Sequence, residues 1–333
     1  MDTPSAAPLR WGIVAPGEIA GVFASAVNRH GRQQLVAVAS RSSQRAREFA
    51  ETHGIDHSVG SYQELFDSPD VDALYIASHI GGHLELAEGA VEAGKHVLVE
   101  KPLHYSSSAA TRTLAKARGA GILMTEAMLT RYLPQSSVIT QIVDSDEFGE
   151  PEHLLATFAV DNRRIDRLWR PNTGGITYDM GIYPIALAHQ IFGQPSRIDA
   201  SGEVTTTGMD QASIVRLSYP SGATATLVIS GVASFPCSAT ISGQNYALTL
   251  EHPFFVPTVI RLTDKELYST SISWSDGTAA TGHDGLYYQA EWFAQYVDEG
   301  RVESPLHTHA EISSNLEVAE EISRALNATV STE

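Results

Sequence analysis

Three side chains of this 333-residue sequence could together move a proton at a carbonyl or hydroxyl oxygen: Lys101, Asp179 and Tyr183. A phenol titrates near 10 when unperturbed, so it ionises near neutrality only beside an ammonium group, which Lys101 could supply. Asp179 and Tyr183 are four residues apart and would share one face of a helix. Taken singly, Tyr183 is more simply a packed core tyrosine and Lys101 an exposed lysine. If the fold brings them together, the phenol could give a proton to a substrate oxygen or take one from it.

A second chemical signal is the segment Arg10–Ala20, which has small residues at Ala15, Gly17 and Ala20. In a turn between a strand and a helix, small residues let the backbone approach a pyrophosphate, and the helix N-terminus offers free N–H groups. The match is imperfect, because alanine replaces the first glycine and Pro16 has no N–H. Since Ala15 precedes proline, we expect it to be extended. The expected ligand is a dinucleotide; the alternative is a tight turn without a ligand.

The choice of cofactor depends on the end of the next strand, which reads Ser40-Arg41-Ser42-Ser43. A carboxylate at this place would bind the ribose diol of NAD, and the sequence has none there. Ser40 and Arg41 could instead hold a 2′-phosphate through charge-assisted hydrogen bonds. The alternative is a solvated arginine beside a serine that caps the following helix. The segment therefore favours NADP, with NAD still possible.

Hydrophobic periodicity shows which elements must position these groups. In the first third of the chain, apolar strand-like segments alternate with helical patterns, which predicts right-handed βαβ crossovers and a parallel sheet. The expected strands are Leu9–Val14, Leu35–Ser40, Ala73–Ala77, His96–Glu100 and Ile122–Thr125. Lys101 follows the fourth of these strands directly, so it should point towards the ligand crevice at the carboxyl edge of the sheet.

The pattern changes after about Arg131. Alternating segments, which indicate a mostly antiparallel sheet, are Leu154–Val160, Ser213–Tyr219, Thr224–Ser230 and Ala247–Leu250. Helical patterns lie at Gln135–Val143, Gly285–Val297 and Ala310–Leu326. We predict an α/β chain with two domains: an N-terminal Rossmann doubly wound parallel sheet over residues 1–128, and an α+β domain with a large, open, mostly antiparallel sheet over 129–333. Because Pro184 disfavours helix at the residue before it, a local break is expected at Tyr183.

Composition excludes several classes of function. The net charge is −17, so nucleic acid and anionic membrane surfaces are poor partners. Cys237 is the single cysteine, which rules out an internal disulfide and a cysteine zinc site. The pair His307 and His309 lacks supporting ligands, so we expect a polar loop and no metal. The N-terminus does not read as a secretory signal and no segment is long and apolar enough to span a membrane, so a cytoplasmic location is expected.

The strand followed by Glu100-Lys101-Pro102, some way after the dinucleotide turn, resembles the Gfo/Idh/MocA oxidoreductase family. The resemblance covers nearly the whole chain, and within the family it is greatest to the branch of glucose–fructose oxidoreductase, dimeric dihydrodiol dehydrogenase and NADP-dependent xylose dehydrogenase. Further segments that follow the family order are Val38–Arg41, Tyr75–Ser78, His83, Glu126-Ala-Met, Arg131, Gly174-Gly175 and Asp179–Tyr183.

The resemblance implies a role for each matching residue. Tyr183 would be the proton donor and acceptor, Lys101 would lower its pKa and contact the substrate, and Asp179 would assist. The residues expected to bind the cofactor are Ala15, Pro16, Gly17, Glu18, Ile19, Ser40, Arg41, Ser78, His79, His83, Glu100, Lys101, Trp169 and Arg170.

The function expected from the resemblance is hydride transfer between NADP, or NAD, and a carbinol or carbonyl carbon of a sugar, cyclic polyol or trans-dihydrodiol. Its partner would be this small carbohydrate or diol. Two alternatives stay open: a dinucleotide-sensing regulator, which would need no acid–base group, and an NAD-dependent glycosidase, which would turn over without external nicotinamide. The second half has too few helices to cover both faces of its sheet, and family members bury the open face, so we expect a homodimer or homotetramer.

Overall fold

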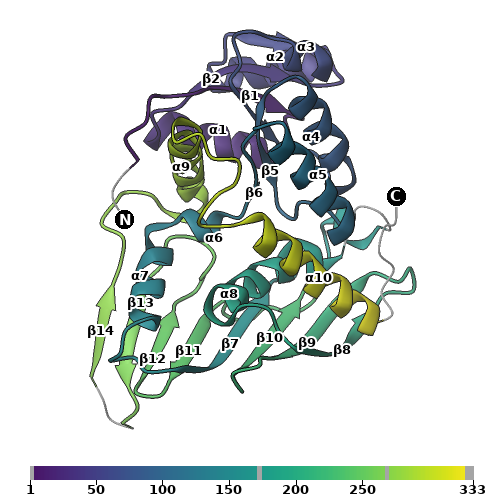
Figure 1. The fold of residues 1–333 in the computed structure, drawn as a ribbon. Helices are drawn as coiled ribbons and strands as arrows, with labels where there is room; N and C mark the ends of the chain where they lie inside the picture. The colour runs from purple at the N-terminus through teal and green to yellow at the C-terminus, as the bar shows by residue number, and fades with distance from the viewer. Residues whose placement is uncertain (1–3, 171–174, 267–269, 327–333) are drawn as a thin grey trace. The chain divides into compact units, whose positions relative to one another are not determined.

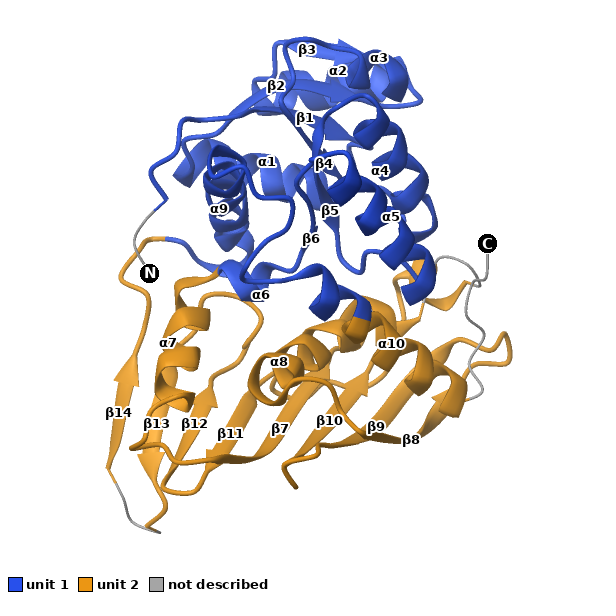
Figure 2. Ribbon diagram, viewed as in Figure 1, with its two compact units in different colours: residues 1–132, 280–313 blue, residues 133–279, 314–333 orange. Residues whose placement is uncertain are grey.

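The computed structural model describes residues 4–170, 175–266 and 270–326. The chain divides into two compact units, coloured in Figure 2. The first unit contains Met1–Tyr132 and Ala280–Ser313, and the second contains Leu133–Ala279 and Ser314–Glu333. The domain boundary predicted near residue 128 stays a prediction. None of the helices in the described ranges has the length and apolar character needed to cross a membrane.

A six-stranded parallel sheet forms the centre of the first unit (Figure 1). Its order is β3-β2-β1-β4-β5-β6, so the order reverses beside β1. The carboxyl ends of β1 and β4 therefore flank the topological switch point, where ligands bind in sheets of this kind. The strands are β1 Arg10–Val14, β2 Gln34–Ala39, β3 His57–Val59, β4 Ala73–Ile76, β5 His96–Glu100 and β6 Met124–Ala127.

The helices of the first unit follow the strands, as βαβ crossovers require. They are α1 Glu18–His30, α2 Ser43–His53, α3 Tyr62–Phe66, α4 His83–Glu92, α5 Ser107–Gly119, α6 Leu129–Tyr132 and, from the later segment, α9 Leu286–Asp298. The 3-10 turns η1 Ile80–Gly82 and η4 Gly282–Gly285 precede α4 and α9.

Helix α9 completes the core of this unit although it comes late in the sequence. Trp11 of β1 is fully buried, and its ring lies 5.0 Å from that of Phe293 in α9 and 6.0 Å from that of Phe23 in α1. At the edge of the same contact, the Arg32 guanidinium is 2.9 Å from the buried Glu291 carboxylate. The segment 280–313 therefore belongs to the packing of the parallel-sheet unit.

The second unit is built on an eight-stranded sheet of order β14-β13-β12-β11-β7-β10-β9-β8. Among the described strands of this second sheet, only the pair β7 and β10 is parallel. The strands are β7 Pro151–Ala159, β8 Arg197–Val204, β9 Asp210–Ser218, β10 Thr224–Ser230, β11 Ala239–Gly243, β12 Tyr246–Leu250, β13 Ile260–Asp264 and β14 Ser271–Trp274. This arrangement confirms the predicted fold class.

Helices lie along one face of this sheet (Figure 1). They are α7 Pro134–Val143, α8 Ile182–Phe192 and the later part of α10 His309–Ala325, and α8 contacts β7 and β10. On the other face, Leu155 and Ile214 are 47% and 57% exposed. They lie among side chains that are mostly small and uncharged, such as Val228 and Thr226. The sheet thus has one covered face and one open, partly apolar face.

The backbone corrects one expectation and refines another. Ala15 is not extended; its φ is +65°, because the chain must turn from β1 into α1 while the Ala15 N–H still bonds the Ala39 carbonyl at 3.1 Å. The left-handed conformation costs a non-glycine residue roughly 1–2 kcal/mol. The break expected at Tyr183 falls slightly earlier: a π-helical turn, η3 Thr177–Gly181, precedes α8. Pro184 is the third residue of α8, and Gly181 before this helix has helical backbone angles, so the π-helical turn continues directly into α8.

Candidate functional site

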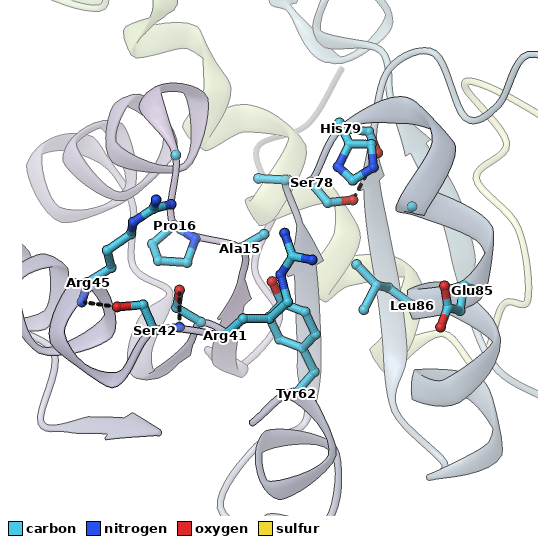
Figure 3. A pocket seen from close by; sticks show the side chains of 14 residues that line it. Ala15, Pro16, Arg41, Ser42, Arg45, Tyr62, Ser78, His79, Glu85 and Leu86 are labelled. Atoms are coloured by element: carbon cyan, nitrogen blue, oxygen red, sulfur yellow. Dashed lines mark hydrogen bonds between the residues drawn. The ribbon is translucent and has the colours of Figure 1, made fainter. Parts of the chain in front are cut away.

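A pocket of about 570 Å³ opens at the switch point of the parallel sheet (Figure 3). Its residues come from the turns after β1, β2 and β4 and from the starts of α2, α3 and α4. They are Ala15, Pro16, Gly17, Ser40, Arg41, Ser42, Arg45, Tyr62, Ala77, Ser78, His79, Gly82, Glu85 and Leu86. Seven of the residues predicted to bind cofactor line it: Ala15, Pro16, Gly17, Ser40, Arg41, Ser78 and His79.

At the first turn of the pocket, Gly17 is the residue before α1. It has no side chain to cap the helix, so the first-turn N–H groups of α1 stay available to an anion. Adding a Cβ at Gly17 would meet only the Ala15 carbonyl oxygen at 4.0 Å, so the space beside the helix start is open. This end of the pocket suits a pyrophosphate.

At the β2 side, the pocket is lined by two exposed guanidinium groups, Arg41 and Arg45 (Figure 3). Ser42 caps α2 by accepting the Arg45 N–H at 3.4 Å, which places Arg45 one turn beyond Arg41. Neither arginine forms an ion pair with a carboxylate of the described residues. These two guanidinium groups could bind a phosphate on the adenosine ribose, and the end of β2 has no acidic residue that would repel it. Sequence reasoning missed Arg45; its place in the first turn of the helix that follows β2 was the available signal.

The loop after β5 carries Lys101, which does not line the pocket. In this loop, Lys101, Pro102 and Leu103 each have a backbone group that contacts a buried side chain. The Lys101 N–H donates to the Glu100 carboxylate at 3.2 Å, and the Leu103 N–H donates to the Glu126 carboxylate at 2.7 Å. The Pro102 carbonyl lies 3.0 Å from His83 Nδ1. The backbone at Lys101 is therefore fixed from three sides.

Burial shapes the electrostatics around this loop. It raises the pKa of Glu100, against the opposing effects of the Tyr75 hydroxyl, which donates to this carboxylate, and of the Lys101 charge. Desolvation also lowers the pKa of His283, in the turn before α9, and the Lys101 ammonium lowers it further. Sequence reasoning did not anticipate His283, because its proximity to Lys101 depends on the return of the chain to the first unit.

His83 is 1% exposed and is absent from the pocket lining. Its Nε2 lies 2.9 Å from the Ser78 carbonyl, at the pocket, and its Nδ1 lies 3.0 Å from the Pro102 carbonyl. Burial lowers its pKa to about 4, although both carbonyls favour the protonated form. His83 thus links the pocket wall to the lysine loop, and its contact with the cofactor stays a prediction.

Asp179 and Tyr183 belong to the second unit. Asp179 lies in the π-helical turn and forms an ion pair with Arg167 at 3.0 Å. Tyr183, 7% exposed, starts α8 and packs against Phe158 and Phe255, with ring centroids 5.6 and 5.4 Å away. π-helical turns are rare and occur frequently at functional sites.

A buried carboxylate anchors this turn. Asp210 of β9 accepts the N–H groups of Ile176 and Thr177 at 3.0 and 2.7 Å, and also the Thr177 hydroxyl. Burial raises the pKa of Asp210, against these hydrogen bonds. Asp210 was not predicted, because nothing in its local sequence distinguishes it from a strand-end aspartate.

The other predicted residues lie apart from the pocket lining. Glu18 and Ile19 are in the first turn of α1. Trp169 and Arg170 end the 3-10 turn η2 Asp166–Trp169 in the second unit; the indole N–H donates to the Asn162 carbonyl at 3.1 Å and Arg170 pairs with Asp166. Gly174 lies outside the described residues. The meeting of Lys101 with Asp179 and Tyr183 stays a prediction.

No cluster of three metal-ligating side chains occurs within the described ranges. The expected polar loop at His307 and His309 is instead a set of buried contacts: His307 Nε2 lies 2.8 Å from the Glu126 carboxylate, and His309 Nε2 lies 2.8 Å from the Met124 carbonyl. Both histidines thus make buried contacts within the first unit.

Comparisons with known proteins bear on this site. Residues 9–127 match the model of an oxidoreductase family with an NAD-binding Rossmann fold, and residues 138–249 match the Gfo/Idh/MocA C-terminal domain. The chain is 30% identical over 329 residues to trans-1,2-dihydrobenzene-1,2-diol dehydrogenase of Sus scrofa, covering 96% of this chain and 98% of the relative. The enzyme of the same name from Homo sapiens is also 30% identical, with the same coverage.

Solved structures show the same fold. A 3-ketoreductase from Actinomadura kijaniata, in complex with NADP and TDP-benzene, superposes with a TM-score of 0.83 at 24% identity, covering 96% of this chain and 98% of that one. UDP-N-acetylglucosamine 3-dehydrogenase from Acidithiobacillus ferrooxidans gives 0.81 at 19% identity, with the same coverage. Both solved structures therefore share the fold of this chain over nearly its whole length.

Proposed function

This chain belongs to the Gfo/Idh/MocA family of NAD(P)-dependent oxidoreductases, and we propose that it transfers a hydride between NADP(H) and a carbinol or carbonyl carbon of a trans-dihydrodiol or sugar. It is a dehydrogenase or reductase acting on hydroxyl or carbonyl groups. The preference for NADP, the substrate class and the residue roles are the proposed parts.

The pocket supports NADP as the cofactor. The start of α1 beside Gly17 would hold the pyrophosphate, and Arg41 with Arg45 would hold the ribose phosphate. When bound, the nicotinamide supplies or accepts the hydride. A related fold, the 3-ketoreductase, has been solved with NADP.

The relatives support the substrate class. The dihydrodiol dehydrogenases match nearly the whole of this chain and are named for a cyclic vicinal diol. The two enzymes of the same fold are named for nucleotide-sugar chemistry or were solved with a thymidine-diphosphate ligand. The diol and the nucleotide sugar in these names both have ring carbons that bear hydroxyl groups, which is the class proposed here.

The chain's own residues would carry the proton. Tyr183 gives a proton to the carbonyl oxygen during reduction and takes it back during oxidation. Lys101 stabilises the phenolate and binds the substrate oxygen, on a loop backbone that three buried side chains fix. Asp179, held by Arg167, assists by orienting the substrate or the tyrosine.

The open face of the eight-stranded sheet supports a homodimer or homotetramer. Leu155 and Ile214 would be exposed in a monomer, and exposed apolar side chains on an uncovered sheet face favour contact with a partner. Burying this face against a second copy would remove both side chains from water, with about 25 cal/mol gained per Å² of apolar surface.

The observation that carries the proposal is the pocket at the switch point in a chain of this family. Two arginines line this pocket and form no ion pair among the described residues. The first test is consumption of NADPH, or reduction of NADP, with a panel of aldoses, ketoses and trans-dihydrodiols. A dinucleotide sensor would bind cofactor without turnover, and a glycosidase would release sugar without consuming added cofactor.

Tyr183→Phe tests the proton role. Removing the hydroxyl should lower turnover 10²- to 10⁴-fold, about the usual contribution of general acid–base catalysis, while NADPH affinity stays nearly unchanged. Tyr219→Phe is the matched control: Tyr219 is a buried tyrosine of the same unit whose hydroxyl has no hydrogen-bond partner among the described residues. Wild-type turnover in Tyr183→Phe would reject the assignment.

A further inference from the structure

We propose that Glu126 and His307 form a buried positioning pair that sets the backbone of the loop 101–103 and thereby the place of the Lys101 ammonium. Neither residue would touch substrate or cofactor. The inference rests on the proposed role of Lys101, and it assigns a task to two residues that the sequence analysis left without one.

The carboxylate of Glu126 connects the loop to the segment 302–311. One of its oxygens accepts the Leu103 N–H at 2.7 Å, and the other lies 2.8 Å from His307 Nε2. Both side chains are 1% exposed. Because the bond reaches the backbone of Leu103, two residues after Lys101, a shift of the carboxylate must move the loop.

A buried carboxylate–histidine contact is costly in desolvation, and apolar residues of similar volume often stabilise a fold as well or better. Stability alone is therefore a poor reason for this pair in the core. A fixed geometry is a better one, because a carboxylate with both oxygens bonded has one favoured orientation. The pair thus fixes the orientation of the Glu126 carboxylate, and the carboxylate in turn fixes the position of the loop backbone.

His307 is itself held from several sides. Its backbone N–H lies 3.2 Å from the Ser304 hydroxyl. The neighbouring Leu306 carbonyl accepts from Arg131 Nε at 2.7 Å, and Arg131 also pairs with Glu311 at 2.9 Å. The imidazole therefore has little freedom to follow Glu126 if the carboxylate moves.

Other elements hold the loop at Lys101 and at Pro102. Glu100 binds the Lys101 N–H and His83 faces the Pro102 carbonyl. Removing Glu126 would free the loop only on the side of Leu103. The expected result is a displaced ammonium group on an otherwise folded unit, and a displacement of about 1 Å can lower a rate about 10²-fold.

The experiment is a double-mutant cycle on hydride transfer, followed by NADPH absorbance in single turnovers. Glu126→Ala should lower the rate roughly 30- to 100-fold with the Kd of NADPH within about twofold. Glu126→Gln keeps an oxygen for the Leu103 N–H and should recover most of the loss. In a Lys101→Met background, Glu126→Ala should cost no more than about twofold further, since the group that it positions is gone.

His307→Gln tests the other half of the pair, because its amide can still donate to Glu126 and should behave as Glu126→Gln does. Thr113→Val is the control: it removes the hydrogen bond from the buried Thr113 hydroxyl to Glu88 in the same unit and should affect stability but not the rate. If Glu126→Ala does not fold, the cycle is run with the isosteric Glu126→Gln and with Glu126→Asp, which withdraws the carboxylate, and Glu126→Asp should then show the larger loss.

The outcomes separate the two proposals. Wild-type rates in Lys101→Met would overturn the catalytic role of the lysine. A slow Lys101→Met together with an unchanged rate in the Glu126 variants would overturn the positioning role alone. So would an equal loss from the Glu126 change in both backgrounds, since that result indicates a general structural defect.

Discussion

Acid should destabilise the first unit through His83, and the size of the effect follows from its burial. The pKa of His83 is lowered to about 4 in the folded chain from an ordinary value of 6.5. The unfolded chain therefore binds the proton more tightly, so stability is present at neutral pH and is lost as pH falls from about 6.5 towards 4. The full difference is about 3 kcal/mol, of which about 2 kcal/mol is lost between pH 7 and pH 5.

The perturbation that isolates this group is His83→Gln. Glutamine does not titrate, and its amide can still donate to the Ser78 or the Pro102 carbonyl. The variant should be less stable than the wild type at pH 7, by about 1 kcal/mol for one weakened hydrogen bond. Because only the wild type loses the contribution of His83, the two stabilities should become equal between pH 6 and pH 5, and at pH 5 the variant should be the more stable by about 1 kcal/mol.

The assay is urea unfolding followed by far-ultraviolet circular dichroism at pH 7, 6 and 5. All other titrating groups are common to both proteins, so the difference between the two curves reports His83 alone. A constant difference from pH 7 to pH 5 would refute the reasoning, and would mean that the two carbonyl groups keep the imidazolium stable despite its burial.

Three further predictions concern the cofactor, the first turn and the open face. Arg41→Ala should raise the Kd of NADPH about 10- to 100-fold, as expected for one charge-assisted phosphate contact, and leave the Kd of NADH within about twofold in a fluorescence titration; an equal loss for both would contradict the phosphate role. Ala15→Gly should raise the free energy of unfolding by about 0.5–1 kcal/mol, because glycine accepts the positive φ, and a urea midpoint below the wild type would contradict this. Ile214→Lys should dissociate the oligomer in light scattering, whereas Ile272→Lys, on the opposite face and 75% exposed, should not; a monomeric wild type at micromolar concentration would reject the oligomer itself.

The sequence predicted the apolar central strands of the parallel sheet and some alternating strands of the second sheet, but it missed β11, Ala239–Gly243, although its side chains alternate. The strand expected at Thr224–Ser230 has the predicted bounds, and helix α9 differs from its prediction by one residue at each end. Strand β8, Arg197–Val204, was missed because neither of its faces is buried, so no alternation marks it. Strand β3 and helix α3 were missed because three and five residues are too few to show a period.

Some features of the candidate site could be predicted from the sequence and others could not. The pocket residues next to the first turn could be predicted because a turn, its strand and its helix are contiguous in sequence. The contact of Glu126 with His307 joins residues 181 positions apart, and no pattern within one sequence indicates such a pairing. The conformation of Ala15 was predicted wrongly, since the local preference of a residue before proline was outweighed by the hydrogen bond that ties it to β2.

The place of α9 in the first unit has a consequence for the order of events during synthesis. Domains generally fold as they emerge, N-terminal part first. Here Trp11 is made early, but its partner Phe293 leaves the ribosome only after some 280 further residues. The aromatic side chains of the nascent parallel sheet therefore stay exposed until Phe293 has been synthesised. Chaperones bind exposed apolar surface of this kind. A fragment that ends at Tyr132 should aggregate unless the segment 280–313 is supplied, for example by fusing it through a short linker.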